Sequence, residues 1–176
     1  MSRQIALKIL VLGDGGVGKT TLTHRYVKGQ FIDTTTMTIG VEFLTKLIEV
    51  DPLKAQLALW DISGQERFFF MIEKYLRGAS GALLLYDITN MKSFVNLGKW
   101  VQVVKDKNPD HADIPIILIA AKCDLEEFSL VGDMYSKNAM KKFGFIDFVK
   151  TSSKTGLNVD QAFKKLVKYI IETRGF

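Results

Sequence analysis

A glycine-rich segment, Gly13–Thr20, ends in a lysine and a threonine and directly follows a run of apolar residues. Its letters, GDGGVGKT, match the pattern GxxxxGK[ST]. Glycines let backbone N–H groups approach a polyphosphate closely, and the N-terminus of a following helix adds donors. Lys19 would add positive charge at the outer phosphates, and the Thr20 hydroxyl could bind Mg²⁺. A chance glycine turn would seldom carry Lys-Thr at this offset, so the segment predicts a phosphate-binding loop.

A second polar segment, Asp61–Gln65, closes another β-rich stretch. A carboxylate there can reach a Mg²⁺ ion, and the flexible Gly64 can direct its amide at a terminal phosphate. An aspartate at a strand end is more often an ordinary turn or cap residue. Together with a phosphate-binding loop, however, Asp61 is predicted to be a metal ligand.

The elements that would position these residues alternate along the chain. Nearly continuous apolar runs predict buried parallel strands, and two stretches joined by Asp51–Leu53 predict an antiparallel pair. The strands are expected at Ile5–Leu12, Val41–Val50, Gln56–Ile62, Ala82–Tyr86 and Ile114–Ala121. The helices are expected at Lys19–Lys28, Met91–Lys107, Asp133–Phe143 and from Val159 to Ile171, with Asn158 or Asp160 as the cap of the last. This order indicates a doubly wound α/β sheet with its site at the carboxyl ends of the strands.

Length and composition are those of one globular domain. The chain has 176 residues, of which 47% are hydrophobic, and a net charge of +5. So mild a charge, interleaved with acids, does not favour a nucleic-acid-binding protein. The single cysteine, Cys123, rules out an internal disulfide, so we expect a cytoplasmic location.

The ends of the chain carry no targeting signal. The first four residues contain neither a signal-peptide core nor the glycine required for myristoylation, and the last four offer no cysteine for prenylation. We therefore expect membrane association only indirectly, or through a lipidated C-terminal tail that this sequence lacks.

Five ordered motifs resemble the Ras superfamily of small GTPases, over a stretch from about Ile5 to Ile171. These motifs are Gly13–Thr20, Thr38–Gly40, Trp60–Phe68, Lys122–Asp124 and Thr151–Lys154. Three further stretches are similar to the Rab branch, namely Ile39–Phe43, Tyr75–Ala79 and Tyr86–Asn90. The resemblance implies a single G domain over residues 1–176, with a six-stranded, mostly parallel sheet, one antiparallel edge strand and about five flanking helices.

The resemblance also implies a role for each residue of a GTP- or GDP-binding site with Mg²⁺. The phosphates would be held by Gly15, Gly16, Val17, Gly18, Lys19, Thr20, Thr21, Thr38 and Gly64. The metal would be held by Thr20, Thr38 and Asp61. Hydrolysis would depend on Gln65, which orients the attacking water, together with Lys19, Thr38 and Gly64.

The guanine base would be recognised by a second group, Phe31, Lys122, Asp124, Ser152, Ser153 and Lys154. The Asp124 carboxylate can accept hydrogen bonds from guanine N1–H and the N2 amine, whereas adenine has an acceptor at N1 and no amine at C2. Phe31 would pack edge-on against the base, although a phenylalanine there could equally belong to the core. A solvated Lys-Cys-Asp at the surface is the corresponding alternative for Lys122–Asp124.

The chain departs from the family at three positions. Ala121 stands where the guanine motif has asparagine, and Ile62 and Ser63 replace the usual Thr-Ala. Loss of two hydrogen bonds at ~0.5 to 1.5 kcal/mol each predicts nucleotide binding weakened by roughly five- to two-hundred-fold. No arginine lies in the phosphate loop, so slow intrinsic hydrolysis is expected.

Partners would bind at a hydrophobic triad, Phe43, Trp60 and Tyr75, that resembles the effector surface of Rab proteins. Burial at a sheet edge is the alternative for these aromatics. At least one residue of Phe68–Phe70 is expected to be exposed, and the protein is expected to be a monomer.

The same motifs allow two alternatives to a hydrolysing switch. One is a nucleotide-gated binding module with negligible hydrolysis. The other, a P-loop kinase or ATPase, is disfavoured because the chain has no room for a lid domain and because of Asp124.

Overall fold

A computed structural model describes residues 3–33, 36–108 and 113–176. Residues 1–2, the N-terminal end of the domain expected over residues 1–176, lie outside the described residues. The described residues form a six-stranded sheet in the order β2-β3-β1-β4-β5-β6. The strands are β1 Gln4–Gly13, β2 Val41–Val50, β3 Leu53–Ile62, β4 Gly81–Asp87, β5 Ile116–Ala121 and β6 Asp147–Lys150. Only β2 runs antiparallel to its neighbour, so the predicted sheet with one antiparallel edge strand is confirmed.

Six α-helices and two 3₁₀ helices accompany the sheet within the described residues. The α-helices are α1 Lys19–Lys28, α2 Ile72–Leu76, α3 Met91–Val95, α4 Leu97–Lys107, α5 Asp133–Phe143 and α6 Val159–Arg174. The 3₁₀ helices are η1 Glu66–Met71 and η2 Cys123–Phe128. None of these helices is both long and apolar enough to cross a membrane.

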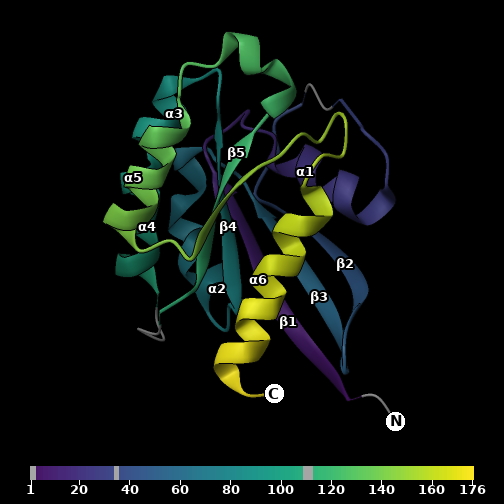
Figure 1. The fold of residues 1–176 in the computed structure, drawn as a ribbon. Coiled ribbons are helices and arrows are strands. Elements are labelled where there is room, and N and C mark those ends of the chain that lie inside the picture. Colours follow the sequence, from purple (N-terminus) through teal and green to yellow (C-terminus); the bar gives the residue numbers. More distant parts are fainter. Residues whose placement is uncertain (1–2, 34–35, 109–112) are drawn as a thin grey trace.

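Alternating side chains of the central strands supply two separate cores, one on each face of the sheet. In β1, Leu7 and Ile9 belong to the core beneath α1 and α6, whereas Leu10 and Leu12 belong to the core beneath α2, α4 and α5. Figure 1 shows α6 and α1 in front of the sheet and α4 and α5 at its other side. Both faces are covered, which is why the central strands are apolar on both sides.

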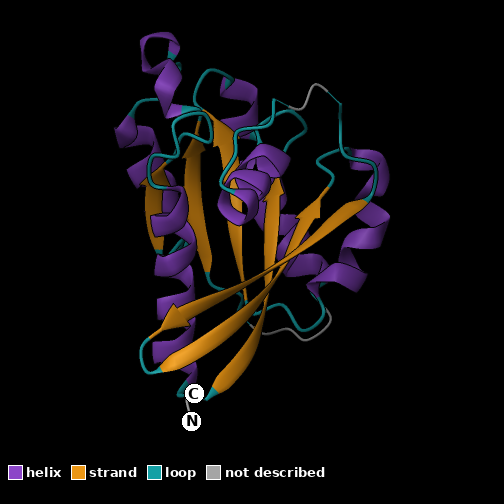
Figure 2. Cartoon of the chain, turned by 90° about the vertical axis from the view of Figure 1, so that its right-hand side faces the viewer, coloured by secondary structure: helices purple, strands orange, loops and turns teal. Residues whose placement is uncertain are grey.

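The carboxyl ends of the parallel strands lie at one edge of the sheet. In Figure 2 the arrowheads of these strands point toward the same end of the molecule, where loops gather, while both chain termini lie at the opposite end. The topology therefore brings loops from distant parts of the sequence together at that edge.

Three predictions about individual elements were wrong. The helix expected over Met91–Lys107 is two helices, because Asn96 ends α3 and precedes α4. Asn158 occupies the N-cap position of α6 as expected, but its side chain does not cap the helix, since its amide donates to the Lys150 carbonyl oxygen at 2.8 Å. Asp160 lies inside the first turn of α6. The strand expected from Gln56 begins at Leu53, directly after the turn.

Candidate functional site

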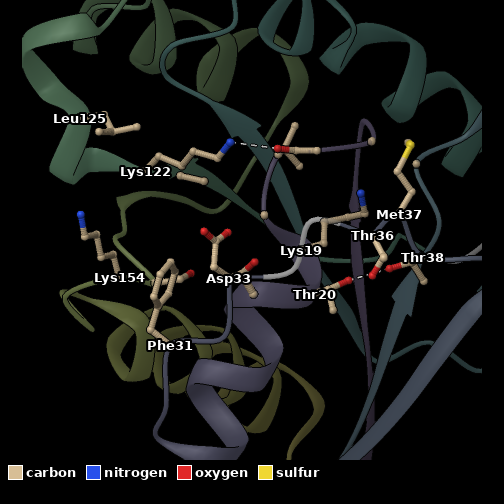
Figure 3. Close-up of a pocket in the computed structure, with 18 of the residues that line it drawn as sticks. Lys19, Thr20, Phe31, Asp33, Thr36, Met37, Thr38, Lys122, Leu125 and Lys154 are labelled. Atoms are coloured by element: carbon tan, nitrogen blue, oxygen red, sulfur yellow. Dashed lines mark hydrogen bonds between the residues drawn. The ribbon is translucent and has the colours of Figure 1, made fainter.

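A cleft with a volume of about 370 Å³ opens at the carboxyl edge of the sheet. It is lined by Gly15, Gly16, Val17, Gly18, Lys19, Thr20, Thr21, Phe31, Asp33, Thr36, Met37, Thr38, Ser63, Gly64, Ala121, Lys122, Asp124, Leu125, Ser153 and Lys154. Figure 3 shows Lys19, Thr20 and Thr38 toward one end and Phe31, Lys154 and Leu125 toward the other. Most predicted site residues thus meet in one cavity, with a lysine and two threonines toward one end.

The glycine-rich loop passes tightly beneath this cleft. Gly13 has a φ of +137°, and a Cβ atom there would lie 2.4 Å from the carbonyl oxygen of Leu85. Only glycine fits both the backbone angle and the contact with β4. Gly18 then takes a left-handed conformation immediately before α1, so the N-terminus of that helix faces the loop.

Lys19 is the buried cation of the cleft. Its side chain is 5% exposed, and Nζ donates a hydrogen bond to the Asp14 carbonyl oxygen at 2.7 Å. Burial lowers the pKa of Lys19 to about 8, and the nearby carboxylates of Asp61 and Asp14 oppose that shift. The buried ammonium group is thus poorly compensated, and an anion in the cleft would stabilise its charged form.

Oxygen ligands of the kind that Mg²⁺ prefers converge beside Lys19. The hydroxyl oxygens of Thr20 and Thr38 lie 2.7 Å apart, and Thr20 also donates to Asp61. Asp61 is 1% exposed, and within the described residues its Oδ1 has no hydrogen-bond partner. Burial raises the pKa of this carboxyl. Two hydroxyls and a buried, half-satisfied carboxylate fit a small divalent cation, which would supply the missing partner.

Gly64 lies against the phosphate loop and lines the cleft, whereas Gln65 does not line it. A Cβ atom on Gly64 would lie 2.3 Å from the backbone nitrogen of Gly15, so no larger residue fits this approach. The Gln65 side chain donates to the carbonyl oxygen of Thr38 at 3.3 Å. The two segments predicted to contact the terminal phosphate therefore also contact each other.

The opposite end of the cleft carries the residues expected at the base. Asp124, Ser153 and Lys154 line it, whereas Ser152 is fully buried behind it. The Ser152 hydroxyl donates to Asp124 Oδ1 at 2.7 Å and accepts from the Thr155 backbone N–H at 3.1 Å. Ser152 thus orients the carboxylate without facing the cavity.

Ala121 lies in the wall of the cleft at the end of β5, and the next residue bridges to the phosphate loop. Lys122 has a left-handed backbone with a φ of 65°. Its Nζ donates to the Gly16 carbonyl oxygen at 3.0 Å. A lysine therefore connects the base-side segment to the phosphate-side segment next to the alanine.

Six lining residues were not among the predicted site residues. Asp33, Thr36, Met37 and Leu125 were not singled out at all, and Ser63 and Ala121 were named only as departures from the family. The first three belong to the irregular segment between α1 and β2, where no hydrophobic period indicates which side chains turn inward. The Met37 methyl carbon lies 2.6 Å from the position that a Cβ atom of Gly15 would take. The only signal in the sequence for the residues that were not singled out was their position close to Thr38 or Asp124 along the chain.

The three aromatics expected at a partner surface are neighbours in space. The ring centroids of Phe43 and Trp60 lie 5.2 Å apart, and those of Trp60 and Tyr75 lie 5.6 Å apart. Phe43 is 52% exposed, so this cluster is not simply core. Phe70 is 75% exposed, as expected for one residue of the phenylalanine run.

Comparison with known proteins identifies the family. The Ras family model matches residues 8–172. The chain is 40% identical over 163 residues to the Ras-related protein Rab-11B of Dictyostelium discoideum, covering 93% of this chain and 73% of that protein. It is 38% identical over 168 residues to Rab-13 of Bos taurus, covering 96% and 81%. It is 36% identical over 168 residues to Rab-15 of Homo sapiens, covering 96% and 78%. The chain therefore belongs to the Ras family, as a Rab-like small GTPase.

Proposed function

We propose that this GTPase is a magnesium-dependent switch that hydrolyses GTP slowly and shows partners a surface that changes with the bound nucleotide. One observation carries the proposal: the Thr20 hydroxyl contacts both the Thr38 hydroxyl and the buried Asp61 carboxylate next to Lys19, at one end of a cleft whose other end holds Asp124. A nucleotide needs this combination, because its charge lies at one end and its hydrogen-bonding base at the other.

The phosphate end would work mainly through the backbone. N–H groups of Gly15, Gly16, Val17 and Gly18, with those at the start of α1 including Thr21, would surround the phosphates. The Lys19 ammonium would approach the outer phosphates, which compensate its burial. The positive end of the α1 dipole adds to the attraction.

Thr20, Thr38 and Asp61 would hold Mg²⁺ through their oxygens. Bound there, Mg²⁺ supplies positive charge that offsets the phosphate oxygens and the charge that develops as the terminal phosphoryl group leaves. Thr38 belongs to the segment between α1 and β2, so its attachment to the metal and the terminal phosphate would hold that segment closed. Loss of that phosphate would release it.

At the base end, Asp124 would select guanine. Its carboxylate is oriented by Ser152 and would accept from guanine N1–H and the N2 amine. Adenine would leave the charge unpaired, which is a strong basis for rejection. Lys122 and Phe31 would contact the base plane, and Ser153 and Lys154 would close the rim of the cleft.

Hydrolysis would depend on Gln65, whose side chain would exchange its contact with the Thr38 carbonyl oxygen for one with the attacking water. Gly64 would offer its backbone N–H to the terminal phosphate. No arginine in Gly13–Thr20 supplies further charge in the transition state, so fast turnover would need a partner protein.

The partner surface would be formed by Phe43, Trp60 and Tyr75, because these neighbouring aromatics come from β2, β3 and α2, elements that lie close to Thr38, Gly64 and Gln65 in the sequence. The Rab names of the relatives support a role in recruiting effectors during membrane traffic. We propose a monomer in the cytoplasm that acts at membranes peripherally and does not bind nucleic acid.

A second candidate is a nucleotide-gated binding module without appreciable hydrolysis. The departures Ala121, Ile62 and Ser63 favour it, since all three lie at or beside the cleft. Single-turnover release of phosphate from bound GTP separates the two candidates, because only a hydrolysing switch produces phosphate within the lifetime of the bound nucleotide.

The metal-dependent part of the proposal is tested by GDP release with and without a chelator. In the parent protein, removal of Mg²⁺ is expected to accelerate release at least about tenfold. In Asp61→Asn, release in Mg²⁺ is expected to be fast and nearly insensitive to the chelator. The matched variant Asp51→Asn, in an exposed turn, should behave like the parent. Equal chelator sensitivity in Asp61→Asn and the parent would remove Asp61 from the metal site.

A further inference from the structure

The phosphate loop contains an acidic residue, Asp14, that faces away from the nucleotide cleft. Asp14 is absent from the described lining residues of the cleft, although Gly15 and Gly16 beside it belong to the lining. A carboxylate that turned into the cleft would repel the phosphates. Something must therefore hold this side chain outside.

Two donors from the start of α4 hold both oxygens of the Asp14 carboxylate. Asn96 Nδ2 donates to Oδ2 at 2.6 Å, and Trp100 Nε1 donates to Oδ1 at 2.8 Å. Asn96 and Trp100 are one helical turn apart, so their side chains project to the same side. Trp100 is 1% exposed, which leaves its N–H few other partners.

The main chain at Asp14 is held independently. Its carbonyl oxygen accepts from Lys19 Nζ, and the backbone of Gly64 lies against it so closely that a Cβ atom there would be 2.3 Å from its carbonyl carbon. Side chain and backbone are thus fixed by different elements. The first half of the phosphate loop owes its shape in part to α4.

The same helix contacts the segment that follows Gln65. The rings of Phe69 and Trp100 meet edge to face, with centroids 4.8 Å apart and planes at 62°. Lys99 forms an ion pair with Glu66, and its ammonium lies 5.5 Å from the centroid of the Phe69 ring. Trp100 therefore contacts the phosphate loop through its N–H and η1 through its ring.

We infer that Asn96 and Trp100 are positioning residues that keep the Asp14 carboxylate out of the nucleotide cleft, and that Trp100 transmits the state of the phosphate loop to Glu66–Met71. The inference rests on the proposed nucleotide switch and adds a route of coupling through α4. The physical basis is one indole group in contact with both segments, so that a movement of either changes the other's contact.

GDP release from four proteins tests the positioning role: the parent, Trp100→Phe, Asp14→Ala and the double variant. Trp100→Phe keeps a buried aromatic ring but removes the N–H donor, so one of the two hydrogen bonds that hold the carboxylate is lost and release should accelerate by about three- to tenfold. In Asp14→Ala the Trp100 N–H has no carboxylate to bind. Trp100→Phe should then change release by less than about twofold in the Asp14→Ala background.

Asn96→Ala should reproduce the effect through the second carboxylate oxygen, and its matched control is Asn138→Ala on the exposed face of α5. Melting temperatures of all variants separate a folding defect from an effect on release. If Trp100→Phe accelerates release equally with and without the Asp14 carboxylate, Trp100 acts through general packing and the inference is wrong.

Fluorescence tests the coupling. The chain has two tryptophans, so Trp60→Phe leaves Trp100 as the only indole. Its emission should differ between the GDP-bound protein and the protein bound to a non-hydrolysable GTP analogue, and Phe69→Leu should reduce that difference. Identical emission in both states contradicts the coupling. A parent protein that binds no GDP contradicts the proposed function and this inference together. If the parent binds GDP but the effects of Trp100→Phe and Asp14→Ala on GDP release are additive, the inference alone is contradicted.

Discussion

The ammonium nitrogen of Lys122 lies 2.6 Å from Oδ2 of the buried Asp87. The other oxygen of Asp87 accepts from the backbone N–H and the hydroxyl of Thr89, so the carboxylate is fixed at the end of β4. Because Lys122 also donates to Gly16, one side chain joins β4, the base-side segment and the phosphate loop. In a chain with Ala121 in place of an asparagine, this lysine supplies a connection between the two ends of the cleft.

Neutralising Asp87 should loosen that connection. Asp87→Asn keeps the shape of the side chain but removes the charge that holds Lys122, so GDP release is expected to accelerate by about three- to tenfold. Release of a fluorescent GDP analogue measures it. Asp147→Asn, which removes the surface ion pair with Lys165, is the matched control. An Asp87→Asn protein with the parent's release rate would show that the Gly16 bond alone suffices.

Ala121→Asn should slow GDP release. Ala121 lies in the cleft wall, where an asparagine amide could bond both to the base and to the phosphate loop. Two added hydrogen bonds correspond to a release rate roughly five- to two-hundred-fold lower. Ala121→Ser, too short to bridge, should remain near the parent. Equal off-rates for the parent and Ala121→Asn would indicate that another group already supplies those bonds.

Ser152→Ala should weaken guanine recognition without altering the phosphate end. The variant removes the hydroxyl that donates to Asp124, and a lost bond to a charged group of ~1.5 kcal/mol lowers GDP affinity about tenfold. Ser129→Ala, which also loses one hydroxyl but lies outside the cleft lining, is its control. Calorimetric titration compares them. Equal affinities would mean that Asp124 keeps its orientation unaided.

Gln65→Leu should reduce intrinsic hydrolysis while GDP binding persists. The leucine fills similar space but cannot orient water, so the single-turnover rate is expected to fall on the order of a hundredfold. Because Gln65 lies outside the cleft lining, GDP affinity should change little. An unchanged phosphate-release rate in the variant would exclude Gln65 from the reaction.

The elements that follow from local patterns were predictable, and those set by distant contacts were not. The bounds of α1 and α5 were predicted correctly because their periods and following glycines are local signals. The break between α3 and α4 is different. The Asn96 side chain donates a hydrogen bond to the carboxylate of Asp14, which lies 82 positions away in the sequence, and no helical period reveals this contact. The short strand β6 lacks an apolar run, since Asp147 and Lys150 are two of its four residues.

The site shows the same division. Gly13–Thr20 is a contiguous motif, and six of its residues, Gly15 to Thr20, line the cleft. Ser152 was predicted to contact the base, but it is buried and donates to Asp124 instead. Its hydroxyl is held by the backbone N–H of Thr155, a contact that the sequence does not reveal. Asp87 and Asn96 were not predicted as site residues because each contacts the cleft only through another residue. Their contributions depend on three-dimensional contacts between separate strands and helices.

The central claim, that Lys19, Thr20 and Asp61 hold a magnesium-bound guanine nucleotide, is tested most directly by calorimetric titration of the nucleotide-free protein. GDP and GTP should bind in Mg²⁺ at least about a hundredfold more tightly than ADP, and a chelator should weaken both. A folded protein that shows no magnesium-dependent binding of either guanine nucleotide would contradict the account.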